Sequence, residues 1–282
     1  MDDQDQERYS GLLKRTNPVS GAQFSPVRLL LIPLLVFIVW AVETFLLEGS
    51  ILVFTRYQPE LFFVYMVVAN ILIGTIGPVL CLNPAFLSGA VNMYQVGFRS
   101  LKRTLVTVAM TACAGYLVLA AVTPYGMDRI LLVSTALVML PVAIASVMIC
   151  WVLVGTHLQA YVRNSGAAVS ILSGVLVTGL LFGLSFAVHS PPLNDPRHIL
   201  TGIGIGIVSA VFFFAVRDIY AAAVFLDVFL VWVIQGHLDP VYIQAVSPVI
   251  AGAAGLSLIA LAGGQWYLSR RFITIQLPVP PE

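Results

Sequence analysis

The run ILLVSTALVMLPVAIASVMICWVLVGT, at residues 130–156, decides the fold class because it contains no charged side chain. A single helix needs about 20 apolar residues to cross the roughly 30 Å hydrocarbon core of a bilayer. Residues 130–156 are long enough to do so, and the same helix could continue toward Tyr161. We therefore expect a transmembrane helix in this part of the chain.

The composition indicates that this helix belongs to an integral membrane protein. Hydrophobic residues make up 59% of the 282 residues and charged residues only 10%, and the mean hydropathy is +0.97. A soluble domain carries roughly a quarter of its residues as charged side chains, so the lipid bilayer is the expected partner. The formal net charge of +1 predicts no general attraction to nucleic acid.

Further apolar runs of similar length predict an all-α, polytopic membrane helix bundle of about eight transmembrane helices. We expect the spans at residues 29–47, 60–82, 105–123, 130–156, 167–189, 199–216, 219–236 and 243–268. The chain then divides into an N-terminal tail (1–28), the bundle (29–269) and a C-terminal tail (270–282). The short connection at Arg217 and Asp218 is the weakest join in this count.

The lysines and arginines predict the orientation of the bundle. With eight spans, 11 of the 14 basic residues fall on one membrane face, and only Arg56, Arg129 and Arg197 fall on the other. Cytoplasmic ends of membrane proteins carry an excess of Lys and Arg. We therefore expect both termini in the cytoplasm and the protein in the plasma membrane.

One pattern predicts a helix at the membrane surface. Leu87, Val91, Tyr94, Phe98 and Leu101 recur at spacings of four and three, which is typical of an amphipathic helix lying in the cytoplasmic interface. Such a helix would serve either as a linker at the lipid headgroups or as a site for a lipid or partner.

Pairs of glycines four residues apart predict close helix packing. The pairs are Gly179 with Gly183 and Gly202 with Gly206. Small residues at this spacing let two membrane helices approach each other closely. We expect the three cysteines, Cys81, Cys113 and Cys150, to be buried apolar residues, because they lie in three separate runs without paired spacing.

Ionisable residues inside the spans are the candidates for a functional site, because each costs roughly 2.5–3.5 kcal/mol near the bilayer centre. Glu43 falls in the outer part of the first span, and Asp227 falls about halfway along the seventh. His189 and His237 fall at the outer membrane face. Glu48 is expected at the outer boundary itself, as an ordinary surface acid.

These residues allow two interpretations. Glu43, His189, Asp227 and His237 could line a polar cavity that opens outward and binds a metal, carries protons or holds a polar substrate. Alternatively, each side chain finds its own partner separately. No HExxH or similar spacing identifies a metal site, and the sequence identifies no cofactor.

Motifs in the second half of the chain resemble those of the CAAX-processing family of intramembrane metalloproteases, which an eight-helix bundle also suits. Phe182-Gly-Leu-Ser-Phe-Ala-Val-His189 is similar to the Phe-and-His motif in that family's fifth helix. Asp227 falls near its third motif, which pairs a histidine with Asn or Asp. The family's glutamate-pair motif is absent, since residues 150–156 read CWVLVGT. The resemblance implies either a scaffold that has lost catalysis or a hydrolase with a different metal set.

The first functional hypothesis is a non-catalytic membrane protein, either a binding or assembly subunit with a membrane-protein partner or a carrier of a small polar molecule. The alternative is a metal-dependent intramembrane hydrolase. The hydrolase needs Glu43, His189 and Asp227 to converge on one water-accessible point. A subunit can leave them on separate faces, and a carrier needs a binding site near the bilayer midplane.

Overall fold

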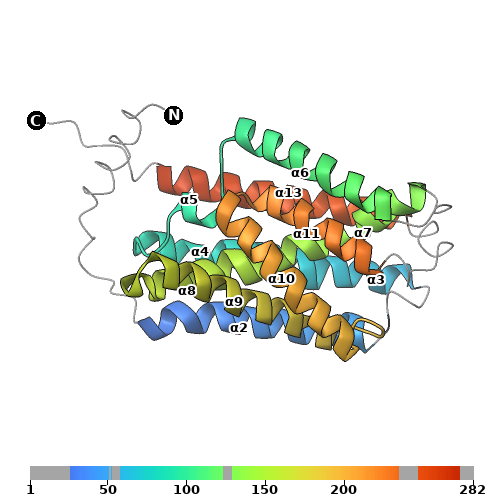
Figure 1. Cartoon of the computed structure of the whole chain (residues 1–282), viewed down its shortest axis with the longest axis horizontal. Coiled ribbons are helices and arrows are strands. Elements are labelled where there is room, and N and C mark those ends of the chain that lie inside the picture. Colours follow the sequence, from blue (N-terminus) through green and yellow to red (C-terminus); the bar gives the residue numbers. More distant parts are fainter. Residues whose placement is uncertain (1–25, 51, 53–57, 123–128, 235–246, 274–282) are drawn as a thin grey trace, which may run out of the picture.

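The structure, a computed structural model, describes residues 26–50, 52, 58–122, 129–234 and 247–273 (Figure 1). Every regular element in these ranges is helical, so the prediction of an all-α bundle is confirmed. Seven helical segments are long and apolar enough to cross a membrane, and an eighth apolar helix, α11 (Ile219–Ile234), has 16 residues. The expected tails fall mostly outside the described residues, although the last helix continues through Arg270 and Arg271.

Several of the membrane-crossing helices are composite, because short π-helical or 3₁₀ segments continue them. The elements are α2 (Pro26–Thr44) with η1 (Phe45–Gly49), α3 (Pro59–Tyr65) with η2 (Met66–Ile76) and α4 (Gly77–Leu87), α5 (Met93–Val96), α6 (Leu101–Val122), α7 (Arg129–Ser146) with η3 (Val147–Gly155) and α8 (Thr156–Tyr161), η4 (Arg163–Ser165), α9 (Ala167–Ser185) with η5 (Phe186–Val188), α10 (Pro196–Val216), α11 (Ile219–Ile234) and α13 (Ser247–Ile273).

The α7–η3–α8 helix is the centre of the bundle. In its most apolar window, 89% of the residues are buried, against 6% in the segment that contains α6. It is packed against α2, η2, α9, α11 and α13. Other helices therefore surround residues 130–156 on every side, and this central helix is the element against which they are arranged.

The chain enters and leaves the bundle at the same end, as it must if it crosses the bundle an even number of times. Figure 1 shows that α2 begins and α13 ends at the same end of the bundle. In the same view α6 runs along one edge, where it packs on α11. The structure contains no membrane, so the cytoplasmic location of this end stays a prediction from the charges.

Helices α9 and α10 meet through the glycines that the sequence singled out. A Cβ on Gly183 would lie 2.5 Å from the backbone nitrogen of Ile203, and a Cβ on Gly206 would lie 2.7 Å from the carbonyl oxygen of Gly179. Both distances are shorter than van der Waals contact. The prediction of close packing is therefore confirmed for this pair of helices.

The expected interfacial helix at residues 87–101 is wrong. Helix α4 ends at Leu87, and the only helix between Leu87 and the start of α6 is the four-residue α5. Gly97 ends α5 with φ +96°, a left-handed conformation that L side chains rarely adopt. Val91 and Phe98 are buried in the bundle, so two of the five apolar positions point inward and the five do not form one exposed face.

The cysteines differ in their surroundings. Cys150 is buried in η3, Cys81 is half-buried, and Cys113 is exposed on α6. The expectation that all three are buried is therefore wrong for Cys113. All three are free thiols, as their separate positions predicted.

Gly183→Ala tests the close contact between α9 and α10. We expect it to lower the free energy of unfolding by about 1–3 kcal/mol, because the added methyl group overlaps Ile203. Gly204→Ala is the matched control, since nothing lies within 4 Å of a Cβ there, and it should leave the stability unchanged or raise it slightly. Thermal unfolding in detergent measures both variants, and equal losses would contradict the packing.

Candidate functional site

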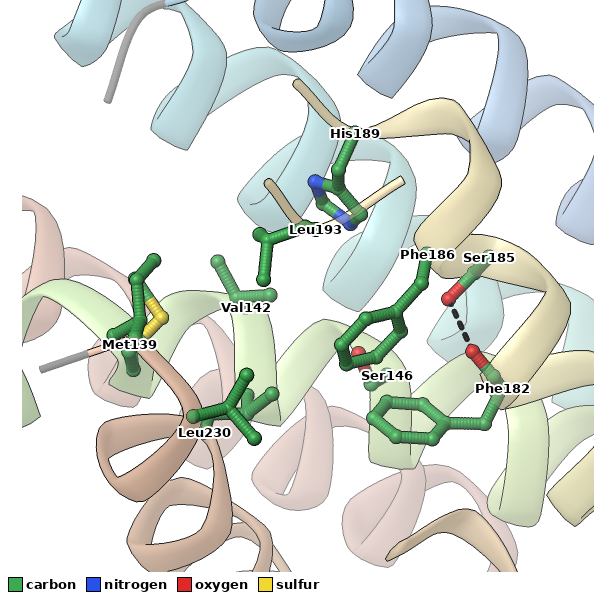
Figure 2. Close-up of a pocket in the computed structure, with 11 residues that line it drawn as sticks. Met139, Val142, Ser146, Phe182, Ser185, Phe186, His189, Leu193 and Leu230 are labelled. Carbon is green, nitrogen blue, oxygen red and sulfur yellow. Dashed lines mark hydrogen bonds between the residues drawn. The ribbon is translucent and has the colours of Figure 1, made fainter. Parts of the chain in front are cut away.

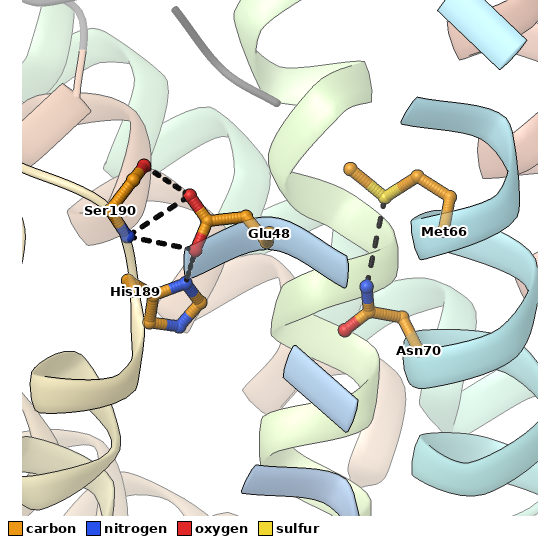
Figure 3. A network of polar contacts seen from close by, with 5 residues as sticks. All are labelled: Glu48, Met66, Asn70, His189 and Ser190. Atoms are coloured by element: carbon orange, nitrogen blue, oxygen red, sulfur yellow. Dashed lines mark hydrogen bonds and ion pairs between the residues drawn. The ribbon is translucent and has the colours of Figure 1, made fainter. Parts of the chain in front are cut away.

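A buried carboxylate joins the first and fifth membrane spans. Glu48, in η1, is fully buried, and its Oε2 accepts a hydrogen bond from Nδ1 of His189 at 2.9 Å. The backbone N–H of Ser190 donates to both carboxylate oxygens, at 3.2 and 3.0 Å, and the Ser190 hydroxyl donates to Oε1. Figure 3 shows His189 and Ser190 on the same side of the carboxylate. We call this arrangement the Glu48 clasp.

Local geometry explains how the clasp forms. Trp40, Thr44 and Glu48 lie four residues apart, so they share the face of the first span that points into the bundle. The next residue, Gly49, approaches the carbonyl oxygen of Val188 so closely that a Cβ would lie 2.2 Å from it. This approach places Glu48 against His189 and Ser190, and the prediction that Glu48 is an ordinary surface acid is wrong.

His189 connects the clasp to a small internal cavity. His189 bonds Glu48 through Nδ1, so its other ring nitrogen, Nε2, is left for a ligand. The cavity has a volume of about 20 Å³, room for about one water molecule. Figure 2 shows its largely apolar wall, to which α7 contributes Ser146 and α9 contributes Ser185.

Two of the other residues singled out in the sequence have different surroundings. Asp227 is buried in α11, where its Oδ2 accepts a hydrogen bond from the hydroxyl of Tyr116 in α6 at 2.6 Å. Glu43 is half-buried and makes no hydrogen bond or ion pair with the described residues. His237 lies outside the described ranges.

The structure therefore pairs His189 with Glu48 and Asp227 with Tyr116. Among residues 26–50, 52, 58–122, 129–234 and 247–273, no three His, Cys, Asp or Glu side chains form a group that could hold a metal ion. A polar cavity shared by Glu43, His189, Asp227 and His237 stays a prediction.

Five buried polar atoms in the central part of the bundle have no hydrogen-bond partner among the described residues. They are Nε1 of Trp40, Oγ1 of Thr44, Oδ1 of Asn70, Oγ of Ser146 and Nε1 of Trp151. Each of these side chains is at most 1% exposed. They come from α2, η2 and the α7–η3 helix, three segments that pack against one another.

Three of these side chains lie at a similar depth in the bundle. A second small cavity, at the end where α2 begins, is lined by residues of the same three composite helices, including Leu29, Cys81 and His157. Three of the side chains each lie eleven residues from a residue of this cavity, toward the opposite end of the bundle. The pairs are Trp40 with Leu29, Asn70 with Cys81, and Ser146 with His157. At about 1.5 Å per residue the three side chains lie on the order of 15 Å from that cavity, a distance of about half the thickness of a bilayer core.

Asn70 illustrates the incomplete pairing of these groups. Its Nδ2 donates to Sδ of Met66 at 3.8 Å, a weak acceptor, as Figure 3 shows, and its side chain also interacts with Tyr65. Its carbonyl oxygen Oδ1 has no partner among the described residues. We call the five unpaired groups the midplane polar layer, in which Thr44 and Trp151 lie about one helical turn to either side of the other three.

Two aspartates of the α10–α11 unit hold α6 to the bundle. Asp218 accepts hydrogen bonds from the hydroxyls of Thr104 at 2.8 Å and Thr107 at 3.1 Å, and Tyr116 bonds Asp227 farther along. Asp218 also accepts from the backbone N–H of Ala221, which caps the start of α11. These bonds give Asp227 a role in packing.

The connection between α10 and α11 is closely tied to its neighbours. Arg217 adopts a left-handed conformation (φ 53°, ψ 50°), and its guanidinium donates to the carbonyl of Gln95 at 2.8 Å and to Oε1 of Gln159 at 2.7 Å. Nε of Arg99 donates to the carbonyl of Arg217 at 2.7 Å. Burial lowers the pKa of Arg217 to about 10, so the guanidinium stays charged at neutral pH. At this join, the weakest point of the span count, α10 and α11 are separate helices connected by a tight and well-bonded turn.

Comparisons of the chain with protein-family models, with curated proteins and with solved structures find no match. The resemblance to the CAAX-processing family therefore stays a prediction from its motifs.

Glu48→Ala tests the clasp. We expect it to lower the free energy of unfolding by about 3 kcal/mol, because His189 and Ser190 lose the acceptor that pairs them. Glu43→Ala removes an acid from the same helix that has no bonded partner among the described residues, and it should change the stability by less than about 1 kcal/mol. Unfolding in detergent, followed by tryptophan fluorescence, measures both. A smaller loss for Glu48→Ala than for Glu43→Ala would refute the clasp.

The bond between Tyr116 and Asp227 can be tested by a double-mutant cycle. Tyr116→Phe leaves a buried carboxylate without its donor and should cost about 1–3 kcal/mol of unfolding free energy. In an Asp227→Leu background the same change should cost much less, because no acid remains to be paired. Additive effects in thermal unfolding would show that the two residues are not coupled.

Proposed function

We propose that the protein is a non-catalytic integral membrane protein that binds a small polar molecule at the midplane polar layer and carries it across the membrane. The observation that supports this proposal most is the group of five unpaired polar atoms on α2, η2 and the α7–η3 helix. Their mixture of donors and acceptors suits an uncharged or zwitterionic molecule. Asn70 Oδ1 would accept, the two indole N–H groups would donate, and the hydroxyls could do either.

The energetic cost of this layer supports a ligand. A buried polar group without a partner costs about 1–3 kcal/mol, so five of them together cost about as much as the whole net stability of a typical protein, about 5–15 kcal/mol. Most buried polar groups in native proteins are bonded, and exceptions need an explanation. A molecule that bonds several of these groups offsets the cost.

The backbone around the layer supports the same function. Among the described residues, the π-helical segments are η1, η2 and η3, which carry Glu48, Asn70 and Trp151. Ser146 directly precedes η3. Inserted π-helical turns occur frequently at functional sites of membrane and soluble proteins. Here they occur in the three spans that supply the polar atoms.

The Glu48 clasp supplies the part of a carrier that closes one side. It connects the end of the first span to the loop after the fifth, and His189 lines the cavity that Ser146 also lines. That cavity has room for about one water molecule, so it is too small to admit a larger molecule. Breaking the clasp would separate the two segments and open a route from Ser146 to the outer surface.

Two other functions are less well supported. An assembly subunit would use the exposed apolar face of α6, but this function leaves the midplane polar layer unexplained. A hydrolase of the CAAX-processing type would require a metal held by Glu43, His189 and Asp227, and two of these residues have other bonded partners. We further propose that the protein lies in the plasma membrane, with the clasp on the outer face, because the charges predict that orientation.

Cysteine accessibility tests the proposed opening. Ser146→Cys, in a chain whose Cys81, Cys113 and Cys150 are replaced by alanine, is treated from outside with a membrane-impermeant thiosulfonate. We expect slow modification when the clasp is intact. With Glu48→Gln added, we expect modification at least about tenfold faster, because a weakening of about 1.4 kcal/mol increases the open population tenfold.

Two matched controls make the result specific. Glu43→Gln, on the same helix, should leave the rate for Ser146→Cys unchanged. Ser209→Cys replaces a buried serine of α10 that does not line the cavity, and it should stay unmodified in both backgrounds. If folded protein shows no modification of Ser146→Cys with or without Glu48→Gln, the carrier function is wrong and a closed assembly subunit is favoured.

A further inference from the structure

A group of cations lies where α5 leads into α6, apart from the midplane polar layer. Arg99 precedes α6, and Lys102 and Arg103 lie in its first turn. Arg217 contacts the same segment through Gln95. We call Arg99, Lys102 and Arg103 the basic cluster. It lies at the end of the bundle where the charges predict the cytoplasm.

Arg99 is held in a fixed position with part of its guanidinium unused. Nε donates to the carbonyl of Arg217 at 2.7 Å, and the guanidinium carbon lies 3.3 Å from the centroid of the Tyr94 ring. No described residue accepts a hydrogen bond from its two terminal nitrogens. A planar guanidinium fixed in this way presents two parallel donors, the geometry that binds phosphate bidentately.

The basic cluster makes no ion pair with the described residues, and the attraction between Asp218 and Arg99 offsets only part of its charge. The one ion pair within those residues joins His189 and Glu48, at the other end of the bundle. Asp218 lies close to the cluster, but its carboxylate accepts from Thr104 and Thr107. Cations in the first turn of a helix are also disfavoured by the helix dipole. An anion bound there would offset both effects.

The surface next to the basic cluster is apolar along the length of a lipid chain. Leu101 and Leu105 are 74% and 59% exposed on α6, and Met110, farther along the helix, is 68% exposed. This helix packs on α11 and otherwise faces outward along the edge of the bundle in Figure 1. A molecule with an anionic head and long apolar chains therefore matches both parts of the surface.

We propose that the basic cluster binds the phosphodiester headgroup of an anionic phospholipid, whose acyl chains lie along the exposed face of α6. The terminal nitrogens of Arg99 bind the phosphate, and Lys102 and Arg103 add charge attraction. This site does not depend on the proposed carrier function. Its physical basis is the attraction of cations to anionic lipids in the cytoplasmic leaflet.

Lipid titration of the full-length protein, followed by native mass spectrometry from detergent, tests the site. Phosphatidylglycerol should bind at least about fivefold more tightly than phosphatidylcholine. Lys102→Ala and Arg103→Ala should each weaken phosphatidylglycerol binding roughly fivefold, the effect of one cation near an anionic surface. Both leave the Arg99 bond to Arg217 intact. Arg163→Ala removes an exposed cation at the same end of the bundle and should have no effect.

Arg99→Lys tests whether binding depends on the paired guanidinium donors or only on the positive charge. It keeps the cation but loses the paired donors, so it should weaken binding of phosphatidylglycerol while the melting temperature shows whether the protein is folded. Inorganic phosphate at millimolar concentration should not compete. Competition by phosphate would show that the site binds a free anion and not a lipid. Equal binding of the two lipids, or equal effects of Arg163→Ala and Lys102→Ala, would overturn the proposal.

Discussion

The complete burial of the α7–η3–α8 helix is the constraint on which the rest of the structure depends. Its side chains are almost all apolar, and other helices cover them on all sides. The first, second, fifth, seventh and last spans supply that cover. Lipid and protein interior are similarly apolar, so close packing and interhelical hydrogen bonds must hold such helices together.

The contacts between helices follow this rule. The glycines of α9 and α10 let two backbones meet closely, whereas α6, on the edge, is held by polar bonds from Thr104, Thr107 and Tyr116 to two aspartates. The Glu48 clasp uses the same principle at the opposite end of the bundle. A carboxyl group with three bonded donors is tolerated in an apolar interior because its polar atoms have partners. The midplane polar layer is the exception, and its unpaired atoms give it functional interest.

The sequence predicted the membrane spans well because the length of an apolar run is a local property. The expected spans 167–189 and 199–216 correspond to helices that end at Val188 and Val216. The second span continues past its expected end to Leu87, because Pro84 does not stop the helix. The interfacial helix failed because the spacing of apolar residues does not show that Gly97 adopts a positive φ.

The partners of the polar residues could not be predicted in the same way. Glu48 meets His189, 141 positions along the chain, and Asp227 meets Tyr116, 111 positions away. Position along a helix gives depth, but it does not show which neighbour a side chain faces. The spacing of Trp40, Thr44 and Glu48 was the available signal for the clasp, since residues four apart share one face.

The central claim is that the midplane polar layer binds a small polar molecule, and an experimental structure at near-atomic resolution tests it most directly. The protein would be purified from its own membranes in mild detergent, without added ligands. The account predicts non-protein density within hydrogen-bond distance of Oδ1 of Asn70 and Oγ of Ser146. If these atoms, and the indole N–H of Trp40, instead bond protein groups with nothing between them, the claim is contradicted.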